Sequence, residues 1–226
     1  MVVYNVFGSE EYAAFNRQQR QVHQDLQQRR AALDASGAKG QTSARDYANR
    51  LDAVERLNGA AGARVGLAAK SLNFMVIRHE GTHQFFHTIG LDQTPMGQQL
   101  WLGEGLAAYA EPSSVGDRNG ERLALIKDAV SHSAHVPLRD LVQSDAAFTS
   151  GDGQRALLAY AESWSLVYYL MHSPLREEFF RYLAAVRSTA AAGEPSGEQR
   201  VVWLERHLGT SLEQLEGHWA QFVAGL

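Results

Sequence analysis

Two histidines and a glutamate lie within five consecutive residues of the segment "VIRHEGTHQFFH" at positions 76–87. His79 and His83 are four residues apart, so on a helix they lie about 40° apart on one face, one turn above the other. Glu80 directly follows the first histidine. Imidazole is a common zinc ligand, and a neighbouring carboxylate can accept a proton from a water that the same ion holds. The segment therefore predicts two metal ligands and a general base.

A catalytic zinc ion usually has three protein ligands and one open position, so a third ligand must come from another segment. The sequence contains no cysteine, which leaves histidine and carboxylate side chains. Glu104 lies in "WLGEGLAAYAE", 21 positions after His83, which leaves room for a loop and a second, antiparallel helix. Small residues near Glu104 predict that this helix approaches the first one closely: Gly103, Gly105, Ala107 and Ala108.

The pair "HEGTH" and "WLGEGLAAYAE" resembles the gluzincin zinc metallopeptidases, whose third zinc ligand is a downstream glutamate. The segments "AYAESWSLVYYLM" and "HLGTSLEQLEGHWAQFVAGL" are similar to the C-terminal helices of bacterial peptidase-MA-like domains, many of them uncharacterised. The resemblance covers residues 70–226. It implies that one Zn²⁺ ion is bound by His79, His83 and Glu104, and that Glu80 deprotonates the water that attacks a peptide carbonyl.

The resemblance also implies a tyrosine or histidine that donates a hydrogen bond to the oxyanion opposite the metal. Tyr160, in "AYAESW", is our candidate for this catalytic role, and Tyr109, His132 and His135 are alternatives. Tyr160 would otherwise be a packed aromatic residue with a solvated hydroxyl.

Two positions depart from related metallopeptidases. Thermolysin-like gluzincins carry an aspartate four residues after the glutamate ligand, where this chain has Ala108. Metal-bound histidines nearly always donate their second N–H to a carboxylate or a carbonyl, so Glu111 or a backbone oxygen must accept it here. Metzincins place a third histidine six residues after the second, where this chain has Ile89. We therefore expect His87 to lie outside the metal shell.

The elements that position these residues predict a mainly α-helical (α+β) protein: a gluzincin-type domain with a small N-terminal β element and a C-terminal helical bundle. Residues 2–7 are expected to form a strand, and residues 62–70 a short one. Helices are expected at 9–35, 43–57, 71–90, 101–111, 121–131, 155–172, 174–190, 198–207 and 211–224. We interpret residues 1–226 as one domain, with a helical-hairpin insertion at 9–60 and the catalytic core at 70–226.

Composition limits the partners. With 226 residues, 45% of them hydrophobic and 20% charged, the chain is typical of a globular protein. The net charge of -4 comes from interspersed charges, which argues against a nucleic-acid partner. No segment approaches the roughly 18 apolar residues of a membrane span, and the N-terminus does not resemble a signal peptide. We expect a soluble protein, exported if a leader was removed; its oligomeric state is open.

Together with the candidate ligands and base, the resemblance to gluzincins implies a zinc-dependent metallopeptidase that acts on a peptide or protein substrate. The alternative is a catalytically silent, zinc-containing binding or scaffolding module that recruits a partner through the hairpin. Glu80 is present together with all three candidate ligands, which favours the enzyme.

Overall fold

The computed structural model describes residues 74–189 and 194–226, together with scattered residues between positions 20 and 56. The chain divides into two compact units, Met1–Phe74 and Met75–Leu226. In the first unit every described residue is helical, in agreement with the helices predicted at 9–35 and 43–57. The strands predicted at 2–7 and 62–70 lie outside the described residues.

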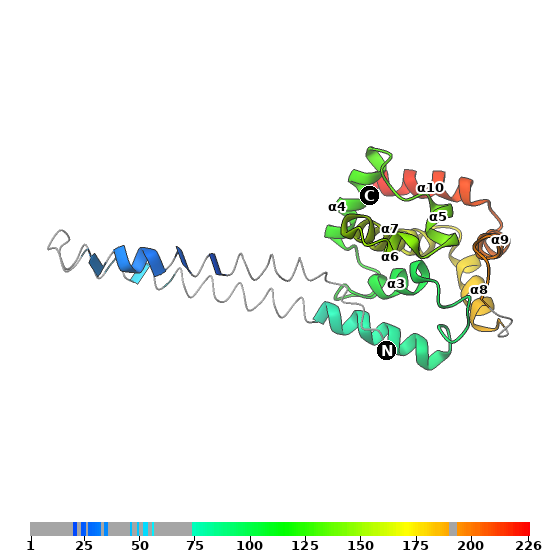
Figure 1. Cartoon of the computed structure of the whole chain (residues 1–226), viewed down its shortest axis with the longest axis horizontal. Coiled ribbons are helices and arrows are strands. Elements are labelled where there is room, and N and C mark those ends of the chain that lie inside the picture. Colours follow the sequence, from blue (N-terminus) through cyan, green and yellow to red (C-terminus); the bar gives the residue numbers. More distant parts are fainter. Residues whose placement is uncertain are drawn as a thin grey trace. The chain divides into compact units, whose positions relative to one another are not determined.

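The second unit is helical throughout its regular structure, and its described residues contain no strand. Residues 75–89 are helical and carry both candidate histidine ligands; we call this segment the histidine helix. The later helices are α3 (Leu100–Tyr109), α4 (Gly120–Ser131), α5 (Leu138–Gln143), α6 (Ala146–Thr149), α7 (Gly153–His172), α8 (Arg176–Arg187), α9 (Gly197–Leu208) and α10 (Leu212–Gly225) (Figure 1).

Most of these helices match the predicted ones. The prediction is confirmed, with ends that differ by a few residues, for the histidine helix, α3, α4, α7, α8, α9 and α10. Helices α5 and α6 were not predicted, because 6 and 4 residues are too few to show a helical period. Local signals set several ends: Gly90, with φ of +78°, follows the histidine helix, and the Ser211 side chain caps α10, both as predicted.

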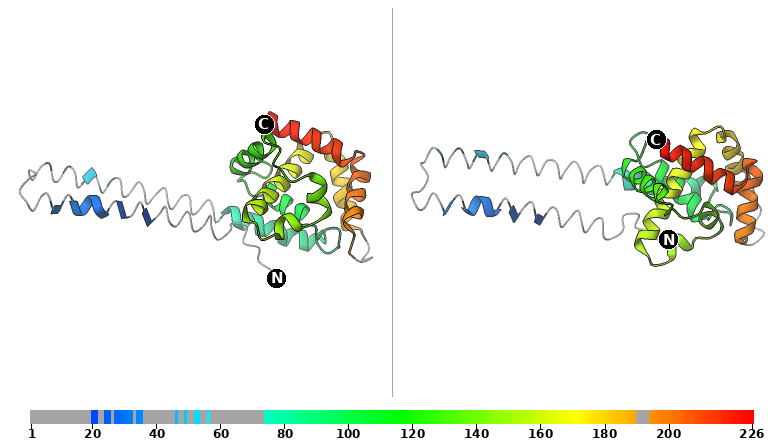
Figure 2. Two further views of the ribbon diagram at one scale, coloured as in Figure 1. Left: turned by 45° about the horizontal axis from the view of Figure 1, so that its top comes forward. Right: turned by 90° about the horizontal axis from the view of Figure 1, so that it is seen from above.

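Helix α7 lies at the centre of the second unit, where it packs against α3, α4, α6, α8 and α10 (Figures 1 and 2). Every side chain from Ala161 to Leu170 is buried, which is typical of a helix surrounded by others. No helix in the described residues is long and apolar enough to cross a membrane. Helix α7 thus forms the support against which α3, the helix of Glu104, is held.

The contact between α3 and α7 depends on Gly105. A Cβ atom at this position would lie 2.7 Å from the carbonyl oxygen of Ser163 and 2.8 Å from Cγ2 of Val167. Any larger residue would push the two helices apart. Because Gly105 directly follows Glu104, this close contact also sets the position of the Glu104 side chain.

Candidate metal centre

The histidine helix and α3 run antiparallel, as predicted. At one end of their contact a Cβ atom on Gly103 would lie 3.9 Å from Cε1 of His83. At the other end Nε of Arg78 donates a hydrogen bond of 2.6 Å to the carbonyl oxygen of Glu111. This arrangement places Glu104 opposite the two histidines.

His79, His83 and Glu104 form a group that could hold a metal ion. Nε2 of His79 lies 3.1 Å from Nε2 of His83 and 3.2 Å from Oε2 of Glu104, and Nε2 of His83 lies 3.7 Å from Oε1 of Glu104. Tetrahedral ligands with bonds of about 2.0–2.1 Å are separated by about 3.3 Å. The three side chains therefore already have the mutual spacing of ligands around one small cation.

The Glu104 carboxylate shows that the group suits a cation. Its Oε2 atom is buried and has no hydrogen-bond partner, although Nε2 of His79 lies 3.2 Å away. A buried carboxylate oxygen without a donor is costly unless a positive charge compensates it. A metal ion between the two imidazoles would supply that charge.

Electrostatics couple His79 to Glu104. Burial alone would lower the pKa of His79, but its interactions with the Glu104 and Glu111 carboxylates outweigh burial and raise the pKa to about 9. Burial would raise the pKa of Glu104, whereas its interactions with His79 and His83 lower that pKa to about 2. Glu104 is therefore a carboxylate, ready to act as a ligand, over the whole physiological range.

Glu111 orients the His79 ring. Nδ1 of His79 lies 3.0 Å from Oε1 of Glu111, and both side chains are buried. Of the two predicted possibilities, a carboxylate or a backbone oxygen, the structure selects the carboxylate. Because Nδ1 faces Glu111, Nε2 is the ring atom that faces His83 and Glu104, as a metal ligand requires.

Glu80 and His87 occupy different parts of the histidine helix. Glu80 is partly exposed and directly follows His79. The His87 side chain is 67% exposed, and its Nδ1 lies 3.4 Å from Oδ1 of Asp92. His87 does not belong to the group of three residues that could hold a metal ion.

The two candidate tyrosines for the oxyanion lie in aromatic contacts. Tyr160, in α7, meets the Phe148 ring edge-on with centroids 5.2 Å apart. Tyr109, at the end of α3, packs against the rings of Tyr168 and His172. Gly116 packs closely against Tyr109, because a Cβ atom at Gly116 would lie 2.5 Å from the Tyr109 hydroxyl oxygen. The role of Tyr160 stays a prediction.

The two alternative histidines make other contacts. Nδ1 of His132 lies 2.9 Å from the carbonyl oxygen of Asp128, one turn earlier in the chain. Nε2 of His135 lies 2.9 Å from Oε1 of Glu216 in α10. Neither histidine belongs to the group of three residues that could hold a metal ion.

The prediction that small residues near Glu104 face the histidine helix is wrong for two of them. Gly105 faces α7, as its contacts with Ser163 and Val167 show. Ala108 is buried in a cluster with two aromatic residues of α7, Trp164 and Tyr168. Residues two apart on a helix point in directions about 200° apart, so Gly103 and Gly105 cannot both pack against the same neighbouring helix.

Arg122 and Asn119 were not predicted from the sequence, yet both donate hydrogen bonds to the Glu111 carboxylate. They lie 11 and 8 residues after Glu111, across a loop. No helical period connects these positions. Asn119 could have been recognised only as an N-cap of α4.

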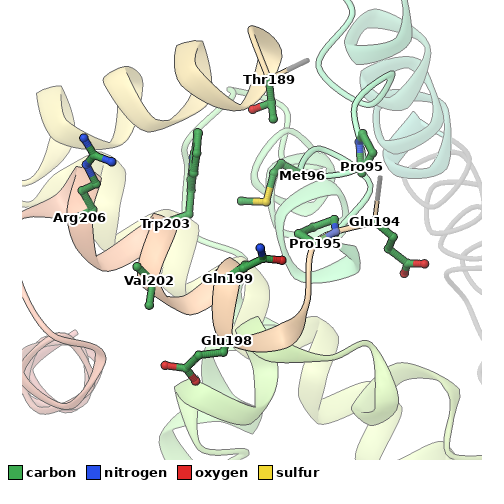
Figure 3. Close-up of a pocket in the computed structure, with 10 residues that line it drawn as sticks. All are labelled: Pro95, Met96, Thr189, Glu194, Pro195, Glu198, Gln199, Val202, Trp203 and Arg206. Carbon is green, nitrogen blue, oxygen red and sulfur yellow. The ribbon is translucent and has the colours of Figure 1, made fainter. Parts of the chain in front are cut away.

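A cavity of about 370 Å³ lies elsewhere in the second unit, against α9 (Figure 3). Trp203 of α9 and Met96 are among the residues that line it. None of the residues that line it is His79, His83, Glu104 or Glu80. The candidate metal centre therefore does not depend on this cavity.

The fold and the site define a mainly helical protein with a His-His-Glu group that could hold a metal ion. Residues 73–191, more than half of the chain, match the family described as "Protein of unknown function (DUF1570)", and the chain belongs to this family. The matched segment includes the three residues of the group, Glu80 and Glu111. No curated protein and no solved structure gives a significant match.

Proposed function

We propose that this protein is a zinc-dependent metallopeptidase that hydrolyses peptide bonds of peptides or proteins. The observation that carries the proposal is the spacing of 3.1–3.7 Å among the ligand atoms of His79, His83 and Glu104. Two imidazoles and one carboxylate form a ligand set that catalytic zinc sites use, and they leave a fourth position open. Glu80 beside His79 adds the base that hydrolysis requires.

When bound, zinc would lower the pKa of a coordinated water toward about 7 and polarise the carbonyl of the substrate. Glu80 accepts the proton of the attacking water and later delivers it to the amine that leaves. Glu111 keeps the His79 ring in one orientation throughout. Tyr160 is the proposed hydrogen-bond donor to the oxyanion. Its helix, α7, packs against α3, the helix that carries Glu104.

Burial indicates the side from which a substrate reaches the site. His79 and Glu104 are buried, whereas the His83 side chain is 30% exposed and Glu80 is partly exposed. A peptide would therefore approach along the face of His83 and Glu80. The buried side keeps water away from the Glu104 carboxylate, which strengthens its interaction with a cation.

The test compares the zinc-loaded wild type with Glu80→Gln on peptide mixtures of varied sequence, with cleavage read by mass spectrometry. Glutamine keeps the size of the side chain and removes the base, so we expect kcat/KM to fall by about 10²–10⁴-fold. Zinc content, measured after dialysis, should be unchanged because Glu80 is not a ligand. Glu177→Gln, the same change at an exposed glutamate in the first turn of α8, is the control and should retain full activity.

Two results would contradict the proposal. Zinc-loaded wild type that cleaves no peptide would remove the peptidase activity and leave the silent zinc-containing binding module. Glu80→Gln with full activity would remove Glu80 from the mechanism.

A further inference from the structure

The N-cap residue and the first turn of α4 make the contacts that hold Glu111 in place. The two Glu111 oxygens accept hydrogen bonds from Nη2 of Arg122 (2.7 Å), Nε of Arg122 (3.1 Å) and Nδ2 of Asn119 (3.0 Å). Nδ1 of His79 is the fourth group at this carboxylate, 3.0 Å from Oε1. Each oxygen thus has two partners, and the carboxylate has one orientation available to it.

Glu111 needs this support because α3 has already ended. The helix stops at Tyr109, so no further turn restrains the Glu111 side chain. Its own backbone makes two contacts, an N–H bond of 3.3 Å to the Ala108 carbonyl and the bond from Arg78. The direction of the carboxylate therefore depends on Arg122 and Asn119.

The start of α4 is itself well anchored. Oδ1 of Asn119 accepts a hydrogen bond from the backbone N–H of Arg122 and so caps the helix. Further along, α4 packs against α7 and α10 (Figure 1). Its Ile126 side chain is fully buried. Asn119 therefore joins a fixed helix end to Glu111 through the two ends of one amide.

We propose that Arg122 and Asn119 are positioning residues of the metal centre: they fix the Glu111 carboxylate, which in turn fixes the His79 ring. Arg122 is suited to this task because its planar guanidinium binds both carboxylate oxygens at once. The Glu111 side chain is 1% exposed and that of Arg122 15%, so water cannot replace these bonds easily. This inference rests on the metal-binding part of the proposed function and not on peptide cleavage.

Two effects of removing Arg122 oppose each other. An unpaired Glu111 carboxylate would attract a cation more strongly, which favours tighter zinc binding. However, a buried carboxylate that loses its fork of donors turns away or takes up a proton, and His79 then loses its orientation. We expect the loss of orientation to dominate, because each of the two Glu111 oxygens would keep only one of its two donors.

The experiment measures the zinc dissociation constant by competition with a coloured chelator, in the full chain. Arg122→Met should weaken zinc binding by about 10–100-fold, the usual effect of losing a group that orients a ligand. Arg118→Met is the matched control, since it removes a positive charge near the same helix end from a residue that contacts the Leu226 carbonyl and not Glu111. Zinc affinity of the control should be unchanged.

Two more variants separate positioning from general stability. Arg122→Lys keeps the charge but lacks the planar fork, so it should recover resistance to urea without recovering zinc affinity. Asn119→Ser keeps a capping oxygen for α4 and removes only the donor to Glu111, so it should weaken zinc binding while the helix stays capped. ¹⁵N NMR of the histidine rings should show an altered His79 signal in the weakened variants.

The inference is overturned if Arg122→Met binds zinc as tightly as the wild type or more tightly. If Arg122→Met does not fold, Asn119→Ser decides, and unchanged affinity together with an unchanged His79 signal overturns it. Wild type that binds no zinc overturns both proposals. Wild type that binds zinc but cleaves no peptide overturns the proposed activity alone.

Discussion

Alanine substitutions at two glycines of α3 should change stability in opposite directions. Gly103 and Gly105 lie in the same helix, and alanine is favoured over glycine within a helix by about 1 kcal/mol. At Gly103 the nearest heavy atom to a new Cβ would be 3.9 Å away, an ordinary contact. Gly103→Ala should therefore stabilise the second unit by about 1 kcal/mol.

At Gly105 the same Cβ atom would meet the Ser163 carbonyl oxygen at 2.7 Å and Cγ2 of Val167 at 2.8 Å. The oxygen belongs to the backbone of α7 and cannot rotate away, so α3 must move by several tenths of an ångström. Overpacking of a core costs about 1–3 kcal/mol, and the upper end applies against backbone. After the gain in helix propensity, Gly105→Ala should destabilise by about 2 kcal/mol.

Tryptophan fluorescence during urea unfolding measures this difference in the second unit alone. All four tryptophans of the chain, Trp101, Trp164, Trp203 and Trp219, belong to that unit. The displacement of α3 should also move Glu104, so Gly105→Ala should weaken zinc binding whereas Gly103→Ala should not. Equal stability changes for the two variants would refute the argument, because they would mean that α3 and α7 are not in close contact at Gly105.

Two further predictions concern a buried charge and a helix end. Burial raises the pKa of Glu162 well above its ordinary value of 4.5, so the folded protein keeps this carboxyl uncharged while the unfolded chain ionises it. The contribution of Glu162 to the free energy of unfolding is fully present below pH 4.5. It is lost as pH rises, by up to about 1.4 kcal/mol per pH unit. Urea unfolding between pH 5 and pH 8 should therefore show a smaller pH dependence for Glu162→Gln than for the wild type, and equal slopes would contradict this. Ser196 forms a capping box with Gln199 at the start of α9, so Ser196→Ala should lower the unfolding free energy by about 1 kcal/mol. Ser196→Asp, which keeps an acceptor, should lose much less, and an equal loss in both variants would show that the loss does not come from the capping acceptor.

Much of the second unit follows from local properties of the chain. The long helices could be predicted because hydrophobic periodicity and end signals, such as Gly90 and Ser211, act over a few neighbouring residues. His79 and His83 could be paired for the same reason, since residues four apart in a helix always share a face. Helices α5 and α6 escaped prediction because they are shorter than the pattern that reveals a helix.

Glu104 is an intermediate case. The spacing after His83 and the small residues around Glu104 were enough to select Glu104 as a candidate ligand. The explanation that these small residues let its helix approach the histidine helix was only partly right. Gly105 allows α3 to approach α7, whereas Glu104 meets the histidines on another face of the same helix, about 100° away. A sequence shows that a helix carries small residues, but the direction in which they face depends on the neighbours that the fold brings to it.

The surroundings of the histidines were decided by tertiary structure. The sequence allowed either Glu111 or a backbone oxygen to orient His79, and only the packing of α3 beside the histidine helix places the carboxylate 3.0 Å from Nδ1. Arg122 and Asn119 reach Glu111 across a loop, where neither helical period nor spacing relates the positions. Residue types and local geometry thus specify which side chains can bind a metal ion. The packing of separate helices specifies which side chains hold those ligands in place, because such contacts join residues that no local rule connects.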